Sequence, residues 1–269
     1  MTEFDEDALA AAYDRGRAAE ARGDLAAAAD AFAEMLRLDP EDRCGVAVRL
    51  AAHGLADAPE KAPPAYVATL FDQNAETFDA MLVDQLGYHV PMMIREALAA
   101  RGLGPFARLL DLGCGTGLTG ESLRDLAAHR TGVDLSEGML AVADDKDVYD
   151  ELYVGDAEGF LVASEGESWD LIAATDVLPY LGPVEGLFAA AAARLAPGGV
   201  FAFSTETMAP EAFAGRAWTI GPKRRYAHDP QKVRAALSAA CMAEIACETI
   251  VVRHEEGAPV PGTLVLARR

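Results

Sequence analysis

The stretch Leu109-Leu110-Asp111-Leu112-Gly113-Cys114-Gly115-Thr116-Gly117 decides the fold class of this chain. An apolar strand ends here in a carboxylate, three alternate glycines follow at once, and a helix-forming run comes next. Alternate glycines let the backbone turn tightly and approach a ligand closely, and the free N–H groups at the start of the helix suit an anionic part of that ligand. The pattern predicts a nucleotide-like cofactor at the end of this strand.

Short strand-like runs recur along the chain, and each of the first five is followed by a helical stretch. Such alternation predicts parallel strands joined by crossover helices. The last two runs are separated only by residues 254–263, which is too short for a crossover, so they are expected to pair antiparallel. We therefore expect an α/β fold with a doubly wound, mostly parallel seven-stranded sheet and an antiparallel C-terminal hairpin. The seven runs are 109–112, 132–135, 152–154, 171–175, 200–204, 245–253 and 264–267.

Two kinds of cofactor are compatible with the glycines, because residues 115–120 also fit the G-x-G-x-x-G pattern of dinucleotide-binding proteins. Asp111 favours a different ligand, since a carboxylate at the strand end attracts an ammonium and a sulfonium but not a pyrophosphate. The C-terminal hairpin also stands where a dinucleotide enzyme normally has its second mononucleotide-binding half. Both observations favour S-adenosylmethionine.

With these residues the chain resembles the class I S-adenosylmethionine-dependent methyltransferases over residues 66–269. The resemblance implies a Rossmann-like fold, methyltransferase activity and S-adenosylmethionine as the cofactor. It also implies that Asp111 lies near the amino group of the cofactor. The loop expected to hold the methionine moiety consists of Gly113, Cys114, Gly115 and Gly117.

Further acids follow the second and third strands. Asp134 lies about 23 residues after Asp111, near the spacing at which a carboxylate binds ribose hydroxyls, and the resemblance gives it that role. The resemblance also implies that Met139 packs against the adenine and that Asp156 accepts a hydrogen from the adenine amino group. From the residues alone, Met139 also suits a helix core and Asp156 a helix N-cap. Leu135 and Ala157 complete this part of the expected cofactor site.

The end of the fourth strand is the expected edge between cofactor and substrate. Ligands of such sheets bind at the carboxyl ends of the strands, so Thr175 and Asp176 are expected to face the cofactor and Tyr180 the substrate. Methyl transfer from a sulfonium needs an acceptor lone pair held in line and rid of its proton, but no metal and no covalent intermediate. The candidates for a base or an orienting group are Tyr88, His89, Tyr226 and His228.

Arg224 and Arg225 stand out as part of a basic cluster in an acidic chain. Guanidinium groups bind carboxylates and phosphates in a bidentate manner, so these two residues are candidates for binding an anionic acceptor. The alternative is a solvated loop whose charges favour solubility.

Residues 1–55 are expected to form a small α-helical module. The turn Arg22-Gly23-Asp24 divides an Ala-rich amphipathic stretch into two helices, and a third helix within 42–55 is expected to close the unit. The residues expected to close it are Val46, Val48, Leu50 and Ala51. Residues at tetratricopeptide intervals make the chain resemble tetratricopeptide-containing methyltransferases, and a plain helical hairpin is the alternative. These residues are Gly16, Gly23, Ala28, Phe32 and Pro40.

The next segment, 56–64, is rich in Ala and Pro and is expected to be a linker. The methyltransferase domain is then expected to span 65–269, with N-terminal lid helices over 65–101 that are split by a break at residues 87–91. Because every cofactor motif lies between Asp111 and Asp176, removal of residues 1–64 is expected to leave cofactor binding intact.

Composition narrows the partners. The net charge of −20 repels polyphosphate, so nucleic acid is not expected as the main substrate. There is no apolar run of membrane-spanning length, residues 1–7 carry acids where an export signal needs basic residues, and the four cysteines show neither disulfide nor zinc spacing. These features predict a soluble cytoplasmic protein that contacts no membrane.

The expected function is methyl transfer from S-adenosylmethionine to a small-molecule acceptor. Two other functions are a protein methyltransferase that recognises its partner through the helical repeat and a non-catalytic adaptor, and a nicotinamide enzyme is a further alternative. A single repeat offers little concave surface for a peptide, and an adaptor would be expected to have damaged cofactor motifs. The helical module is also a candidate surface for a protein partner or a homodimer.

Overall fold

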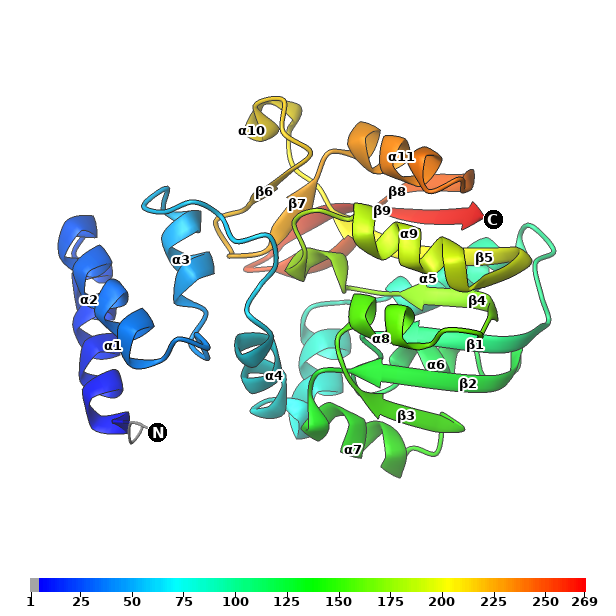
Figure 1. Ribbon diagram of the computed structural model, residues 1–269, viewed down its shortest axis with the longest axis horizontal. Helices are drawn as coiled ribbons and strands as arrows, with labels where there is room; N and C mark the ends of the chain where they lie inside the picture. The colour runs from blue at the N-terminus through cyan, green and yellow to red at the C-terminus, as the bar shows by residue number, and fades with distance from the viewer. Residues whose placement is uncertain (1–4) are drawn as a thin grey trace.

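The computed structural model describes residues 5–269, and residues 1–4, which carry part of the expectation about an export signal, lie outside the described residues. One nine-stranded sheet with helices on both faces forms most of the described chain, and three helices stand to one side of it (Figure 1). Within 5–269 no helix is both long enough and apolar enough to cross a membrane.

The five predicted parallel strands all form, and they pair in the order β3-β2-β1-β4-β5. Their order places β1 and β4 side by side at the switch point, where ligands of open α/β sheets bind. Most of them begin before the predicted runs because partly exposed residues extend them. Their bounds are β1 Phe106–Leu112, β2 Ala127–Asp134, β3 Glu151–Val154, β4 Trp169–Ala174 and β5 Leu195–Glu206.

The C-terminal hairpin pairs antiparallel as predicted, with β8 Ala243–Glu255 against β9 Ala258–Arg268 and β9 against β5. The strands are longer than predicted, because Glu256 and Gly257 alone make the turn. Both have a positive φ, 52° and 79°, which is the conformation of a tight two-residue hairpin turn. The expectation that residues 254–263 separate the strands is therefore wrong.

Two short strands were not predicted: β6 Trp218–Ile220 and β7 Tyr226–His228, which pair antiparallel. β7 joins the sheet beside Glu206 of β5, just beyond the level at which β4 ends. The sheet therefore has nine strands within the described residues and not seven.

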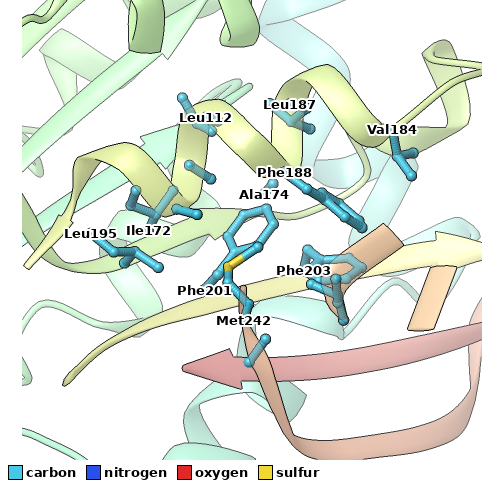
Figure 2. Close-up of a cluster of buried hydrophobic side chains, with 14 of the residues drawn as sticks. Leu112, Ile172, Ala174, Val184, Leu187, Phe188, Leu195, Phe201, Phe203 and Met242 are labelled. Carbon is cyan, nitrogen blue, oxygen red and sulfur yellow. The ribbon is translucent and has the colours of Figure 1, made fainter. Parts of the chain in front are cut away.

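Alternation along the strands builds two cores, one on each face of the sheet. On one face Leu112, Ile172, Phe201 and Phe203 pack against Phe188 of helix α9 (Figure 2). The intervening residues of the same strands face the other side and pack against helix α5. This period of two on strands buried on both faces is what a doubly wound sheet requires.

The helices after β1 are α6 Leu118–Ser122, α7 Glu137–Asp145, α8 Ala157–Ala163, η3 Leu178–Tyr180, α9 Glu185–Arg194, α10 Pro210–Phe213 and α11 Pro230–Ala239.

The helical module begins with α1 Glu6–Ala21 and α2 Leu25–Leu38, joined at the predicted turn. A Cβ on Gly16 would lie 2.3 Å from the Phe32 ring, so the two helices touch at this glycine. Helix α3 Val46–Ala52 has two buried sides: Val46 and Leu50 pack on the α1–α2 pair, whereas Val48 packs against the methyltransferase side. The expectation that all four named side chains of this helix close the module is wrong for Val48.

The second half of the expected linker, from Pro59 onward, is attached to the main domain. The Ala62 N–H donates to the Tyr180 carbonyl oxygen at 2.8 Å, and the Gly182 N–H donates to the Glu60 carbonyl oxygen at 2.7 Å. The Tyr226 hydroxyl donates to the Pro59 carbonyl oxygen at 2.9 Å. We call residues 59–64 the connecting strap, because these bonds hold it against the end of β4 and against β7.

The lid that follows the strap is more broken than predicted. It consists of α4 Pro64–Asp72, η1 Ala75–Thr77, a π-helical turn η2 Ala80–Gln85 and α5 Val90–Ala99. Two carboxylates fix it to the sheet: Asp72 Oδ1 accepts from the Ser136 hydroxyl at 2.5 Å, and Asp79 Oδ1 accepts from the Thr116 hydroxyl at 2.5 Å. The lid is thereby held over the glycine loop.

Candidate active site

A cavity opens at the carboxyl ends of the parallel strands, between the sheet and the lid. We call it the main cavity. Its wall includes most of the predicted cofactor-binding residues, which the fold gathers from the ends of four strands. These are Gly113, Cys114, Gly115, Asp134, Leu135, Asp156, Ala157, Thr175 and Asp176.

Asp134 is the carboxylate at the end of β2. Its Oδ2 accepts from the Gly115 N–H and its Oδ1 from the Ser136 N–H, both at 2.9 Å. Burial raises the pKa of this carboxyl, while the backbone N–H groups act in the opposite direction. Since each carboxylate oxygen has a second lone pair, Asp134 can still accept a pair of ligand hydroxyls.

The glycine loop takes the backbone shape that its composition predicts. Gly113 and Gly115 have φ of 65° and 52°, a region that glycine adopts without strain. A Cβ on Gly115 would meet nothing within 4 Å, because this position faces open space. The loop can therefore bring its backbone close to a ligand.

Asp111 differs from the expectation, since it lies beneath the loop and is absent from the cavity wall. Its Oδ2 accepts a hydrogen bond from the Tyr149 hydroxyl at 2.6 Å, and its buried Oδ1 has no partner within the described chain. Burial raises the pKa of Asp111 to about 7, against the opposing effect of the Tyr149 hydrogen bond. Direct contact with an amino group of the cofactor is thus not what this arrangement offers.

Gly117 and Met139 are also absent from the cavity wall. Gly117 has a φ of 95° at the start of α6, where a Cβ would come within 2.7 Å of Val148, so this glycine serves close packing. Met139 is fully buried in α7, and Leu135 occupies the wall instead. The helix-core alternative for Met139 is therefore the one that the structure shows.

Asp156 lines the cavity and also caps α8 by accepting from the Gly159 N–H at 3.0 Å, and its predicted contact with the adenine amino group stays a prediction. On the opposite wall the Thr175 and Thr119 hydroxyls lie 2.8 Å apart. Tyr88 lines the same wall, and burial raises the pKa of its phenol well above the usual value. Tyr88 therefore keeps its phenol proton at neutral pH.

Asp176 and Arg225 belong to a buried group of charges that we call the ion cluster: Asp176, Glu206, Arg225, Arg253 and Glu255. Arg225 donates from Nη2 to Asp176 Oδ1 and from Nε to Glu206 Oε1, each at 2.6 Å. It also donates from Nη1 to the Tyr180 hydroxyl at 2.6 Å. Arg253 donates from Nη1 to Glu206 Oε1 at 2.7 Å and from Nη2 to Glu255 Oε1 at 2.6 Å.

Arg225 thus donates from all three of its nitrogens to partners within the protein, an arrangement that does not favour its expected role as a binder of anionic acceptors. Arg224 lies in a turn with φ of 62° and lines neither this cavity nor its neighbour. The run of basic residues in the sequence does not predict the ion pairs of Arg225, because the acids that bind it are distant in sequence.

Three of the four catalytic candidates lie away from the cavity wall. His89 is exposed at the start of α5. Tyr226 is fully buried in β7 and binds the strap, and His228 is buried with its Nε2 at 3.0 Å from the Gly182 carbonyl oxygen. Burial lowers the pKa of His228 to about 4, so it is neutral near pH 7. Tyr226 and His228 stabilise the fold around the site, and Tyr88 alone of the four contributes to the wall.

Several wall residues were not predicted as part of the site. The lid supplies apolar side chains that were expected only as parts of the lid helices and of the break between them: Val67, Phe71, Phe78, Leu82 and Pro91. The strap supplies Lys61, Ala62 and Pro64, in a segment that composition alone identifies as a linker. Neither signal shows which cavity these residues face.

Comparison with known sequences agrees with this geometry. Residues 110–203 match the family described as a methyltransferase domain. The chain is 34% identical over 121 residues to the ubiquinone biosynthesis O-methyltransferase of Xanthomonas campestris pv. campestris (strain B100), covering 44% of this chain and 50% of that protein. It is 33% identical over 138 residues to the enzyme of that name from Azorhizobium caulinodans, covering 48% and 53%. The chain thus matches about half the length of these curated relatives.

Solved structures share the fold. The N-methyltransferase NodS of Bradyrhizobium japonicum WM9, in complex with S-adenosyl-L-homocysteine, has a TM-score of 0.58 at 18% identity, covering 76% of this chain and 98% of NodS. An S-adenosylmethionine-dependent methyltransferase from Clostridium acetobutylicum ATCC 824 has a TM-score of 0.55 at 17% identity, covering 74% and 98%. Residues 110–203 therefore resemble a methyltransferase domain, and the chain shares the fold of these S-adenosylmethionine-dependent methyltransferases.

Proposed function

We propose that this chain binds S-adenosylmethionine in the main cavity and transfers its methyl group to a small-molecule acceptor. One observation carries the proposal: the glycine loop, Asp134 and Asp156 line a single cavity at the switch point of the sheet. That set supplies close backbone approach, a carboxylate for ribose hydroxyls and a carboxylate for an amino group.

The residues present fit this cofactor. Open space faces Gly115, so the loop leaves room for a ligand where a side chain would otherwise stand. Asp134 is held rigid by two backbone N–H groups, which fixes its oxygens before a ligand arrives. The apolar Leu135 lies beside it and offers a surface for a flat base. Asp111 acts through the loop from below and does not touch the ligand directly.

S-adenosylmethionine supplies a methyl group already activated by a sulfonium, so the chain contributes position more than chemical activation. Phe71 and Phe78 of the lid restrict the access of water to the main cavity, and Tyr88 is the candidate in its wall for orienting the reacting groups. None of the residues in positions 5–269 forms a cluster suited to holding a metal ion.

The helical module belongs to the same proposal. Its α1–α2 pair has the contact spacing of a tetratricopeptide unit, with Gly16 against Phe32, and we propose that it presents a surface to a protein partner or a second copy of the chain. The four cysteines are free thiols, which supports a cytoplasmic location for the protein.

Incubation of the full chain with S-adenosylmethionine labelled in the methyl group and a bacterial metabolite extract tests the proposal. The expected result is a labelled small molecule together with an equal amount of S-adenosylhomocysteine. Label that is found only on protein would favour the protein methyltransferase alternative, and no release of S-adenosylhomocysteine would contradict the proposed function.

A further inference from the structure

A second cavity lies beside the main one, on the far side of the lid aromatics. Five residues line both cavities: Phe71, Phe78, Leu82, Asp176 and Tyr180. The two spaces are thus separated only by these side chains. We call the second space the side cavity.

The two walls of the side cavity differ in character. Its lid wall is mostly apolar and comes from α4, the two residues that flank η1, η2 and the residue after η2: Leu70, Phe71, Asn74, Phe78, Met81, Leu82 and Leu86. The aromatic rings there are already arranged edge to face, with Phe71 5.7 Å from Phe78 and 5.6 Å from Tyr180 between ring centroids. A flat apolar or aromatic body fits such a wall.

The opposite wall consists of four members of the ion cluster: Asp176, Glu255, Arg225 and Arg253. Glu206, which does not line the cavity, accepts from both guanidinium groups, so the cluster as a whole has three carboxylates against two guanidinium groups. Both guanidinium groups already bind carboxylates inside the protein at 2.6–2.7 Å. An anionic group of a ligand would face the carboxylates of this wall, whose guanidinium partners are already engaged. The hydration that it loses would therefore not be replaced by a new ion pair.

We infer that the side cavity is the acceptor site and that it selects a compact aromatic or apolar acceptor carrying a neutral or cationic group, and excludes carboxylates and phosphates. This inference rests on the proposed function, since it names the acceptor class of the same site. The acceptor reaches the methyl group past Phe71, Phe78 and Tyr180, the side chains shared by both cavities.

The side cavity also has a reporter that the main cavity lacks. Met81 lines the side cavity only, whereas Met92 is 48% exposed on α5 and lines neither. Methionine methyl groups labelled with ¹³C give separate NMR signals. The variants Met81→Leu and Met92→Leu each remove one signal, which assigns that signal to its residue. The full chain saturated with S-adenosylhomocysteine is titrated with three probes of one body: 2-phenylethylamine, 2-phenylethanol and phenylacetate.

The expected result is that the amine and the alcohol shift the Met81 signal and leave Met92 unchanged, and that phenylacetate binds at least tenfold more weakly. Leu70→Trp, which fills the side cavity from α4, should abolish the Met81 shift. The matched control is Gln73→Trp at the exposed end of α4, which lines neither cavity and should preserve it. Calorimetry should show that both variants keep the affinity of the unaltered chain for S-adenosylhomocysteine.

Phenylacetate binding as tightly as the amine would overturn the charge selection. Absence of any Met81 shift with all three probes, in a protein that binds S-adenosylhomocysteine, would overturn the acceptor site and leave the proposed function standing. Failure of S-adenosylhomocysteine itself to bind would overturn the proposed function first, and the inference with it.

Discussion

Asp134 ends β2 and Asp176 follows the end of β4, so the two carboxylates lie at one edge of the sheet, and both line the main cavity. Asp134 is held by the N–H groups of Gly115 and Ser136, which carry no net charge. Asp176 is held by the Arg225 guanidinium and lies 3.6 Å from that of Arg253. A carboxylate fixed by backbone dipoles keeps its charge for a ligand, whereas one fixed by guanidinium groups is largely neutralised. We therefore expect Asp134 to serve binding and Asp176 mainly to hold the wall together.

The largest expected effect comes from breaking the support of Asp176. Arg253 is 3% exposed, and Arg253→Met leaves Glu206 with one guanidinium partner and Glu255 with none of its present ones. We expect a loss of about 3–5 kcal/mol in the free energy of unfolding, because a buried charge loses its partner. Chemical denaturation of both proteins measures it. The control is Arg234→Met, which removes an exposed pair with Glu244 and should cost at most about 1 kcal/mol.

An equal effect of these two substitutions would show that the ion cluster is no more important than a surface pair.

The pH dependence of the free energy of unfolding tests the burial of His228. The folded-state pKa of His228 is lowered to about 4 from 6.5 by burial, so the unfolded chain binds a proton that the folded chain does not. The free energy of unfolding should therefore fall as pH drops from 6.5 towards 4, by up to about 3 kcal/mol from this residue. In His228→Gln, which keeps an N–H donor for Gly182, that part of the pH dependence should be absent. The same dependence in both proteins would show that His228 titrates normally.

The binding carboxylate should behave in the opposite way to the structural one. Asp134→Ala should weaken the affinity for S-adenosylhomocysteine by about 1.5–3 kcal/mol, because a charged hydrogen-bond partner is lost, while the chain still folds. Asp145→Ala, at the exposed end of α7, is the control and should leave affinity unchanged. Isothermal calorimetry compares them. An unchanged affinity in Asp134→Ala would mean that this acid does not hold the ribose.

The smallest effect concerns the helical module, and here the structure changes the expectation. A chain of residues 56–269 keeps the strap and should bind S-adenosylhomocysteine as the full chain does. A chain of residues 65–269 lacks Lys61 and Ala62 of the cavity wall, and should lose more than tenfold in affinity, about 1.4 kcal/mol. Equal affinity of the two shortened chains would show that the strap contributes nothing to the pocket.

The strand ends could be predicted from sequence because one local pattern fixes both backbone and ligand contact. The alternate glycines after Asp111 require a turn, and the turn places Gly113 and Gly115 in the cavity wall whatever surrounds them. The acids that follow β2 and β3 occupy the same edge of the sheet for the same reason. Asp134, Asp156 and Thr175 could therefore be placed in the cavity wall from the sequence, whereas their contacts with a cofactor stay predictions.

The candidates outside the strands could not be assigned from sequence because their partners are remote. Arg225 reads as a solvated cation until Glu206, Arg253 and the hairpin are brought around it. His228 and Tyr226 form a strand that no propensity predicts, and their burial depends on the strap docking against β4 and β7. The environment of Asp111 could not be predicted from the sequence, because its hydrogen-bond partner Tyr149 is 38 residues away along the chain.

The most direct test of the central claim is calorimetry of the full chain with S-adenosylhomocysteine and, separately, with NAD. The cavity offers Asp134 for a ribose and a glycine loop above a buried acid, so S-adenosylhomocysteine should bind and NAD should bind far more weakly. Tighter binding of NAD than of S-adenosylhomocysteine would contradict the assignment of this cavity to a methyltransferase cofactor.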